Sequence, residues 1–289
     1  MNYEIVTDSS ANLTEELIEK FGIHIISLFF IIDDNEYSSY KKGEKTDIGQ
    51  FYDMMRNGKT MSTSTINMSS CEEVFESILS EGKDVLYLGF SSALSGAYNT
   101  ATIMAEKLKD KYPDRKIYSL DTLAASMGEG LLVYYAALQR QEGKCIDEVK
   151  DWVINNRLNL CHWFTVDDLF FLKRGGRISA TTAIVGTALG IKPILHVDDE
   201  GKLVNVGKVR GRKNSLHELV NEMEKTCIKP EEQVIFISHG DCLEDAKYVE
   251  ELIRNKFNVL DVVINFVDPV IGAHSGPGTV ALFFLGTNR

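Results

Sequence analysis

The sequence predicts an α/β protein made of two α/β domains with largely parallel sheets. Short apolar runs alternate with segments that have the periodicity of amphipathic helices, and this alternation indicates βαβ units. The chain has 289 residues, of which 44% are hydrophobic. Because a domain usually has about 100–200 residues, this length indicates two domains. We place the boundary near residue 155, which gives predicted domains at residues 1–155 and 156–289.

The first predicted domain opens with a strand at residues 3–8 and a helix that ends near residue 19. Asn12 or Thr14 would cap this helix. A hairpin follows, because the segments IHIISLFFII and EYSSY flank Asp33-Asp34-Asn35, a turn-forming cluster. The remaining predicted elements of this domain are helices at residues 47–56, 71–80, 98–109 and 127–140 and strands at residues 84–90 and 116–122.

The second predicted domain contains a strand pair that closes around the turn at residues 199–201. Its other predicted elements are helices at residues 216–226 and 243–256 and strands at residues 233–240, 260–267 and 279–286. No linker rich in proline, glycine or serine separates the two predicted domains. A close junction of this kind favours a ligand cleft between domains.

Charge and composition exclude several classes of protein. The formal net charge is -11, from 31 Lys and Arg against 42 Asp and Glu, so the protein as a whole should repel nucleic acid and anionic membranes. The two uncharged stretches, residues 85–105 and 269–288, are rich in hydroxyls and glycines, so we expect no integral membrane segment. The first residues do not resemble a signal peptide, and we expect a cytoplasmic protein. The five cysteines form no CxxC pair, which argues against a disulfide framework or a zinc ribbon.

Three segments rich in hydroxyls or glycine are candidates for ligand binding. Residues 60–65 precede a predicted helix, and hydroxyls and free N–H groups at a helix N-terminus bind anions. Residues 91–98 follow a predicted strand, at the sheet edge where ligands of parallel sheets bind. Residues 272–279 contain glycines that allow close approach of a ligand, and His274, which can donate to an anion. Each segment has a structural alternative, a helix cap or a turn without a ligand.

No complete catalytic motif is present. Residues 238–241, Ser-His-Gly-Asp, contain the residue types of a catalytic triad, but adjacent side chains point apart. The sequence has no GxSxG elbow, no phosphate loop and no HExxH motif, so we expect neither a cofactor nor a metal. A hydrolase or a small-molecule kinase that uses the same serine, threonine and histidine loops remains the alternative.

The order of the motifs resembles that of the DegV family, whose studied members bind fatty acids and serve a bacterial fatty acid kinase. The resemblance extends over nearly the whole chain. Its motifs are TDSSA at residues 7–11, TS at 63–64, SSALSGAY at 91–98, DL at 168–169, LKRGGRI at 172–178, IKPIL at 191–195 and HSGPGT at 274–279. One departure is that the family often has a proline soon after the TS pair, where this chain has Thr65, Ile66 and Asn67.

The resemblance implies a carrier of one long-chain fatty acid and not an enzyme. The acyl chain would lie in an apolar tunnel between the domains or beneath their junction. The residues implied to contact the carboxylate are Thr63, Ser95 and His274, with Ser64, Gly96 and Ser275 as neighbouring supports. The carrier would present the carboxylate to a separate fatty acid kinase, which forms an acyl phosphate for phospholipid metabolism.

Basic residues gather in two places although the whole protein is acidic. The first group surrounds the double glycine of the LKRGGRI motif, and the second lies at residues 208–213. Local positive charge could steer an acidic partner or hold phosphate groups. We therefore expect Arg174, Arg177 and Arg210 to contact the kinase or a phosphate. The alternative is that both groups are solvated basic turns.

Overall fold

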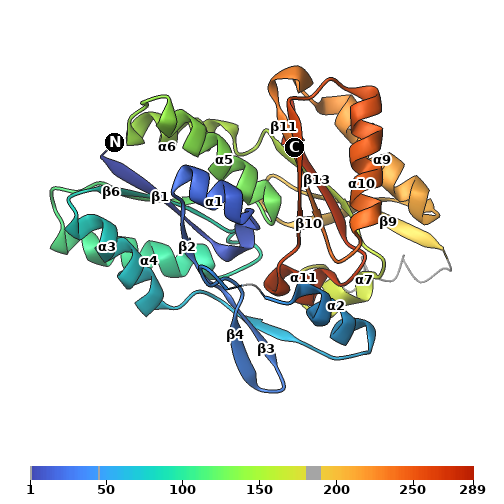
Figure 1. The fold of residues 1–289 in the computed structure, drawn as a ribbon, viewed down its shortest axis with the longest axis horizontal. Coiled ribbons are helices and arrows are strands. Elements are labelled where there is room, and N and C mark those ends of the chain that lie inside the picture. The colour runs from blue at the N-terminus through green and yellow to red at the C-terminus, as the bar shows by residue number, and fades with distance from the viewer. Residues whose placement is uncertain (1, 45, 180–189) are drawn as a thin grey trace.

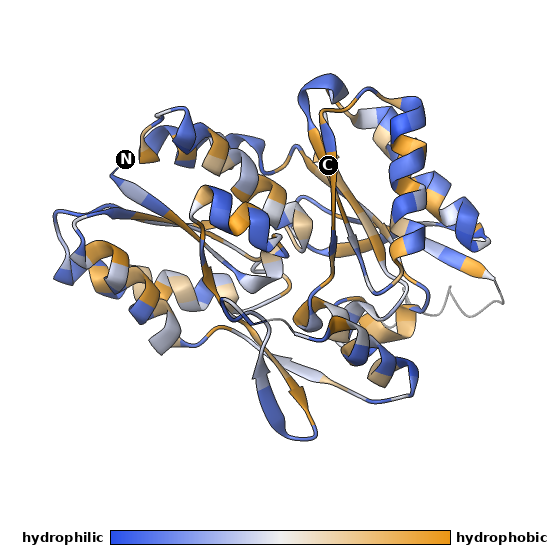
Figure 2. Cartoon of the chain, in the orientation of Figure 1, coloured by the Kyte–Doolittle hydropathy of each residue, from blue (hydrophilic) through white to orange (hydrophobic). Residues whose placement is uncertain are grey.

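The computed structural model describes residues 2–44, 46–179 and 190–289 (Figure 1). A four-stranded sheet and a six-stranded sheet stand next to each other, and a small three-stranded sheet projects beneath them. Helix α5, Met127–Gln141, contacts strands of both larger sheets. Apolar residues concentrate on the strands and on the helix faces that cover them, as Figure 2 shows. The α/β class predicted from the sequence is confirmed.

The four-stranded sheet is parallel throughout, as expected. Its strand order is β2-β1-β6-β7. The strands are β1, Tyr3–Asp8; β2, His24–Ile26; β6, Asp84–Gly89; and β7, Ile117–Asp121. Successive side chains of a strand point to opposite faces, and here both faces are covered. Val85 and Tyr87 pack toward α3 and α4, Met68–Ser80 and Ala97–Lys111, whereas Leu86 and Leu88 belong to the core beneath α5.

Three more helical segments complete this half of the protein. Helix α1, Glu15–Phe21, is capped by Thr14, whose hydroxyl accepts a hydrogen bond from the Leu17 amide at 3.3 Å. A short 3-10 helix, Ser9–Ala11, precedes it. Helix α6, Ile146–Asn156, was not predicted from the sequence. Its first turn has the acidic residues Asp147 and Glu148, which favour a helix N-terminus.

The small sheet confirms the predicted hairpin. Strands β3, Phe29–Ile32, and β4, Asn35–Ser38, are antiparallel and meet at Asp33 and Asp34, which have φ values of 50° and 63°. Two successive residues with positive φ are the mark of a type I′ turn. Strand β5, Ser62–Ser64, pairs with the other side of β3. Helix α2, Ile48–Arg56, lies between β4 and β5 in the sequence and is capped by Asp47.

The six-stranded sheet corrects the prediction of largely parallel sheets. Its order is β10-β9-β8-β13-β11-β12, and only β11 and β12 are parallel. Strands β9 and β10 are joined by a tight turn at Gly201, which forces them to be antiparallel. After α11, Pro269–Ser275, the chain returns to place β13 between β8 and β11, opposite in direction to both. The strands are β8, Leu160–Thr165; β9, Ile191–Val197; β10, Leu203–Arg210; β11, Val234–His239; β12, Asp261–Phe266; and β13, Val280–Leu285.

Helices cover both faces of this sheet. Helix α5 covers one face, and α9, Arg212–Thr226, and α10, Leu243–Lys256, cover the other. The remaining helical segments are α7, Leu169–Arg174; α11, Pro269–Ser275; and the 3-10 helix Pro230–Glu232. None of the helices in the described parts of the chain has the length and apolar character needed to cross a membrane.

Two fully buried carboxyl groups, Asp8 and Glu129, meet at the junction of β1 and α5. Asp8 accepts four hydrogen bonds, from the Ser10 amide and hydroxyl, the Tyr87 hydroxyl and the Phe90 amide. Among the described residues, the Glu129 carboxyl group has hydrogen bonds only to the hydroxyls of Thr7 and Ser10, at 2.9 and 3.1 Å.

The hydroxyls of Thr7 and Ser10 each have a second acceptor. This fact decides which of the two carboxyl groups, Asp8 or Glu129, is protonated. Thr7 also bonds to the Leu88 carbonyl at 2.7 Å, and Ser10 also bonds to Asp8. A hydroxyl has one proton to donate, so an ionised Glu129 would lack donors. Burial raises the pKa of both carboxyl groups, but the hydrogen bonds from Ser10, Phe90 and Tyr87 counteract this effect at Asp8, and the pKa of Glu129 is the one raised well above its ordinary value. We therefore assign the proton to Glu129 and the negative charge to Asp8.

This assignment predicts opposite responses to amide substitution. Glu129→Gln keeps a donor in place of the protonated carboxyl, so it should change the free energy of unfolding little at pH 4 and raise it at pH 7, where the wild type has lost part of its stability. Asp8→Asn places an amide group, itself a donor, among four donors. It should lower the free energy of unfolding by about 1–3 kcal/mol. Urea denaturation followed by circular dichroism measures both.

The same variants test the pH dependence. Because the pKa of Glu129 is raised on folding, its stabilising contribution is present at low pH and lost as pH rises above the ordinary carboxyl range through the raised value. Glu129→Gln should lack this decline. A protein that tolerates Asp8→Asn better than Glu129→Gln would place the proton on Asp8 instead.

Candidate functional site

A cavity lies where the N-terminal and C-terminal halves of the chain meet, with an empty volume of about 930 Å³ that includes space open to solvent. The wall is mostly apolar and comes from both halves. The apolar lining residues are Leu28, Phe90, Leu94, Ala125, Phe164, Leu172, Val197, Leu203, Val267, Val270, Ile271, Ala281 and Phe283.

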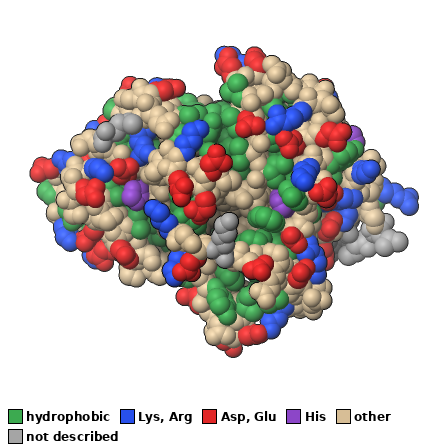
Figure 3. All heavy atoms as spheres, in the orientation of Figure 1, with side chains coloured by type: hydrophobic (Ala, Val, Ile, Leu, Met, Phe, Trp, Pro, Cys, Tyr) green, Lys and Arg blue, Asp and Glu red, His purple; other side chains and the backbone are tan. Residues whose placement is uncertain are grey.

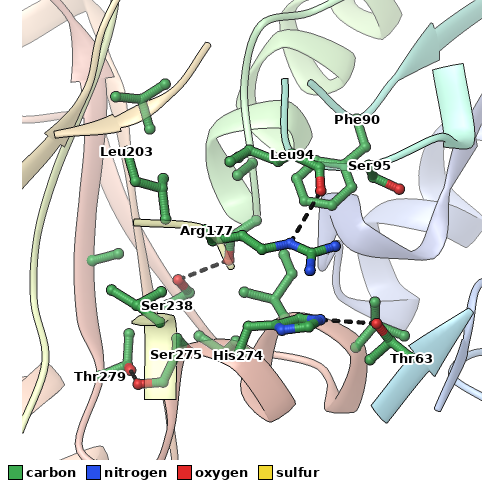
Figure 4. A pocket seen from close by; sticks show the side chains of 18 of the residues that line it. Thr63, Phe90, Leu94, Ser95, Arg177, Leu203, Ser238, His274, Ser275 and Thr279 are labelled. Atoms are coloured by element: carbon green, nitrogen blue, oxygen red, sulfur yellow. Dashed lines mark hydrogen bonds between the residues drawn. The ribbon is translucent and has the colours of Figure 1, made fainter. Parts of the chain in front are cut away.

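All six residues that the sequence predicted for carboxylate binding line this one cavity. They come from three elements far apart in the chain: β5, the loop before α4, and α11. Thr63 and His274 are in direct contact, with 2.8 Å between Oγ1 of Thr63 and Nε2 of His274 (Figure 4). The geometry brings the predicted residues together; their role in binding a carboxylate stays a prediction.

The hydroxyl-rich segment before α3 is built differently from the prediction. We expected its hydroxyls to lie at a helix N-terminus, but residues 62–64 form strand β5, in which Thr63 pairs with Phe30. Helix α3 begins later and is capped by Asn67, whose side-chain oxygen accepts from the Ser70 amide at 2.8 Å. The helix N-terminus is thus occupied by its own cap, and Thr63 reaches the cavity from a strand.

The segment at residues 272–279 is also different from the glycine-rich turn that we expected. Its first part is the end of helix α11, which starts at Pro269 with Asp268 as its cap. The helix ends at Gly276, whose φ of 81° strongly favours glycine. His274 and Ser275 therefore lie on the last helical turn, which is more rigid than a loop would be.

Burial keeps His274 uncharged at neutral pH. Desolvation, and then the positive charges of Arg177 and Arg174, lower the pKa of His274 from 6.5 to about 4. In the tautomer with the proton on Nε2, His274 donates to Thr63, and the Thr63 hydroxyl proton is left for a ligand. A neutral imidazole of this kind orients a hydroxyl and contributes no positive charge to the site.

Three buried polar atoms of the cavity lining have no hydrogen-bond partner among the described residues. They are Oγ1 of Thr65, Oγ of Ser275 and Nδ1 of His274. Buried polar atoms are almost always hydrogen-bonded, so the unpaired hydroxyls of Thr65 and Ser275 indicate a place for a polar group of a ligand, whereas Nδ1 of His274 faces Gly175. Thr65 was not among the predicted site residues, although its position in the hydroxyl-rich segment was a signal.

The three arginines that the sequence predicted to contact a kinase or a phosphate lie in different places in the structure. Arg177 lines the cavity and is half-buried. Arg174 is exposed at the end of α7, with its guanidinium 5.1 Å from the centre of the Phe171 ring. Arg210 is exposed at the end of β10. Arg174 and Arg210 are therefore available to a partner, whereas Arg177 belongs to the cavity.

The triad residue types at residues 238–241 do not assemble into a triad. The Ser238 hydroxyl bonds to the hydroxyl of Ser126 at 2.9 Å, and Nδ1 of His239 accepts from the Cys242 amide at 3.2 Å. Asp241 pairs with Arg56 at 2.5 Å. In the described parts of the chain, no group of three or more His, Cys, Asp or Glu side chains could hold a metal ion.

Comparison with known proteins gives a consistent result. The family model described as "Uncharacterised protein, DegV family" matches residues 2–287. A DegV domain-containing protein of Clostridium perfringens is 48% identical over 287 residues, which cover 99% of this chain and 98% of the relative. A DegV domain-containing protein of Streptococcus pyogenes is 38% identical, with 100% and 99% of the two chains covered.

Solved structures share the whole fold. A DegV lipid-binding protein of Thermotoga maritima superposes with a TM-score of 0.87 at 27% identity, with 100% of both chains covered. A DegV family protein of Thermus thermophilus, described by its fatty acid binding, has a TM-score of 0.88 at 27% identity and covers 99% of this chain and 100% of its own. The family model and the relatives each span nearly the entire sequence, and the chain belongs to the DegV family.

Proposed function

We propose that this protein binds one long-chain fatty acid in the cavity, with the carboxylate at Thr63, Ser95 and His274. The observation that carries the proposal is the composition of the wall: a mostly apolar cavity also presents hydroxyls, a neutral histidine, and buried polar atoms that have no hydrogen-bond partner among the described residues. Ser64, Gly96 and Ser275 line the same cavity and would be neighbouring supports. The descriptions of the relatives from Thermotoga maritima and Thermus thermophilus as lipid-binding and fatty-acid-binding support the same ligand class.

The acyl chain would supply most of the affinity. Burial is worth about 0.8 kcal/mol per CH₂ group, so about 14 methylenes offer roughly 11 kcal/mol before the costs of ordering the ligand. Hydrogen bonds to a charged group contribute about 1.5–3 kcal/mol each, but stripping water from the carboxylate offsets most of this gain. The head-group residues would thus fix the position of the carboxylate more than they strengthen binding.

We also propose that the protein is a carrier, which presents the carboxylate to a separate fatty acid kinase for acyl phosphate formation in phospholipid metabolism. The kinase would supply ATP, Mg²⁺ and the phosphoryl-transfer residues. Arg174 and Arg210 support this proposal, because both are exposed and basic in a protein of net charge -11. The cavity would lie at the junction of two domains, residues 1–155 and 156–289, and the carrier would act in the cytoplasm.

The first prediction concerns the ligand itself. Native mass spectrometry of the purified protein should show an excess mass that corresponds to one long-chain fatty acid and disappears on denaturation. The released compound can be identified by extraction and mass measurement. A protein that purifies empty and also fails to bind added palmitate or oleate would contradict the proposed function, and hydrolysis of fatty esters by the same preparation would favour an enzyme.

A second prediction tests the position of His274. A Cβ atom at Gly175 would lie 2.2 Å from Nδ1 of His274, so Gly175→Ala should displace the ring and break its contact with Thr63. We expect the carboxylate to be misplaced, with kinase-dependent phosphorylation reduced about 100-fold, the effect that a 1 Å misplacement can have, and acyl binding weakened far less.

Gly207→Ala is the matched control, since a Cβ atom there meets only Cβ of Ile194 at 3.7 Å, an ordinary contact. The two variants should have similar melting temperatures and differ in phosphorylation. Equal phosphorylation rates in both variants would show that the position of His274 does not matter.

A third prediction concerns the partner surface. The double variant Arg174→Glu and Arg210→Glu should bind fatty acid normally and slow phosphorylation by the kinase, because the reversed charges would repel an acidic partner. The wild-type rate should fall as salt is raised, since screening weakens steering between exposed charges. Lys229→Glu, on an exposed turn outside both basic groups, is the control. A double variant with the wild-type rate at low and at high salt would mean that these arginines are solvated and do not dock the kinase.

A further inference from the structure

One wall of the cavity comes from the six-stranded sheet. We call the lining residues on its strands the sheet wall, and they are His162, Phe164, Val197, Leu203, Ser238, Ala281 and Phe283. Most of them are apolar, so the sheet wall suits an acyl chain. Its two polar members are His162 and Ser238.

His162 uses its hydrogen-bonding capacity within the protein. Burial lowers the pKa of His162 well below its ordinary value, so the ring is neutral and has one proton. Nδ1 donates this proton to the Leu160 carbonyl at 3.2 Å, and Nε2 accepts from the Ala125 amide at 3.4 Å. Both ring nitrogens are thus occupied, and His162 offers no hydrogen bond to a ligand.

Ser238 is a fully buried polar residue in the apolar part of the cavity. Ala281 of β13 pairs with Ser238 on one side and with Phe164 on the other. Directly opposite residues of paired strands share a face of the sheet, so Ser238 stands in one row with two apolar lining residues. Figure 4 shows Ser238 and Thr63 on opposite sides of His274. Ser238 therefore lies beside the acyl chain in the proposed complex and apart from the Thr63 hydroxyl.

The hydroxyl of Ser238 has unused hydrogen-bonding capacity. Its one partner among the described residues is Oγ of Ser126, at 2.9 Å, and Ser126 also bonds to Oδ1 of Asn12 at 2.8 Å. Ser126 has a single proton to give. If Ser126 donates to Ser238, the proton of Ser238 has no acceptor. If Ser126 donates to Asn12, Ser238 donates to Ser126 and its oxygen has no donor.

The backbone of Ser126 is strained where it makes this contact. Its φ of 55° and ψ of -147° fall in a region that is almost confined to glycine. Ser126 directly precedes α5, a position where a serine usually caps the helix, yet its side chain makes no capping hydrogen bond. The hydroxyl is directed to Asn12 and Ser238 instead. Strained residues of this kind gather at ligand sites, which supports a binding role for the pair Ser126 and Ser238.

We propose that the cavity also takes fatty acids whose acyl chain carries a hydroxyl group, and that Ser238, with Ser126 behind it, binds this hydroxyl. A hydroxyl both donates and accepts, so it matches Ser238 in either arrangement, whereas a methylene group does neither. Against apolar residues alone, the same hydroxyl would lose its hydrogen bonds to water without replacement. This inference rests on the proposed fatty acid site and adds a class of ligand to it.

The test compares three acids of equal chain length, stearate, 10-hydroxystearate and 12-hydroxystearate, in the delipidated full-length protein. Displacement of a fluorescent fatty acid gives the Kd for each. The wild type should bind one hydroxystearate, the isomer whose hydroxyl reaches Ser238, about as tightly as stearate. Ser238→Ala should weaken binding of that isomer about 10-fold relative to stearate, because the ligand hydroxyl is then buried without a partner. Ser238→Cys, whose thiol is a weak donor, should act in the same direction.

Thr279→Val is the matched control. It also removes a hydroxyl from the cavity lining, but one that already donates to the carbonyls of Ser275 and Gly276, at 3.1 and 2.9 Å. It should leave the ratio of the Kd values for hydroxystearate and stearate unchanged. Ser95→Ala removes a head-group hydroxyl and should weaken binding of all three acids by similar factors. If Ser238→Ala also weakens all three acids equally, or leaves the ratio unchanged, the inference is overturned.

The outcome for the wild type separates this inference from the proposed function. Binding of stearate with both hydroxystearates bound at least about 10-fold more weakly would refute the hydroxyl site and leave a fatty acid site. Failure of the delipidated wild type to bind any of the three acids would refute the fatty acid site and the inference with it. Circular dichroism and melting temperature confirm that each variant is folded.

Discussion

The packing of α11 against α2 and β5 is the constraint on which the site depends. The two helices approach closely at Gly272, where a Cβ atom would lie 2.5 Å from the Tyr52 hydroxyl. The same hydroxyl donates to the Val267 carbonyl at 3.0 Å, just before α11 begins. With α11 fixed in this way, its last turn places His274 against Thr63. A larger side chain at residue 272 would separate the helices and move the head-group residues apart.

Electrostatics are local in this protein. The overall charge of -11 is carried on the surface, where acidic and basic side chains are interspersed, as Figure 3 shows for one face. The cavity instead combines a neutral histidine with a cation that has carbonyl partners. The interior pair Asp8 and Glu129 holds a single negative charge, stabilised by four donors. The charge states of these groups thus depend on burial and on their immediate neighbours and not on the net charge of the chain.

Local sequence signals predicted most of the individual elements. Thr14 and Asp47 marked helix starts, and the aspartates at residues 33 and 34 marked the hairpin turn, because capping and turn geometry depend on a few neighbouring residues. The site residues were found through three motifs that resemble those of the family. The structure then showed that the motifs converge.

The predictions that the structure corrects concern segments whose conformation depends on contacts with distant parts of the chain. Residues 62–64 are a strand only because β3 offers a free edge, and β13 is antiparallel to its neighbours only because the chain returns between β8 and β11. Neither fact is present in the local pattern. Arg177 lies within a basic motif and looked like a surface residue, and its burial depends on Leu94, which is 83 residues away.

The contact between Thr63 and His274 joins residues separated by 211 positions in the sequence, which has a consequence for how the protein folds. Contacts of such long range form slowly, because a large loop must close before they contribute. The apolar wall of the cavity is therefore incomplete until both halves are folded and docked. During synthesis the N-terminal half exposes its share of that wall, a state prone to aggregation. A fatty acid that binds only the completed cavity would shift this equilibrium toward the native state by mass action and act as a folding ligand.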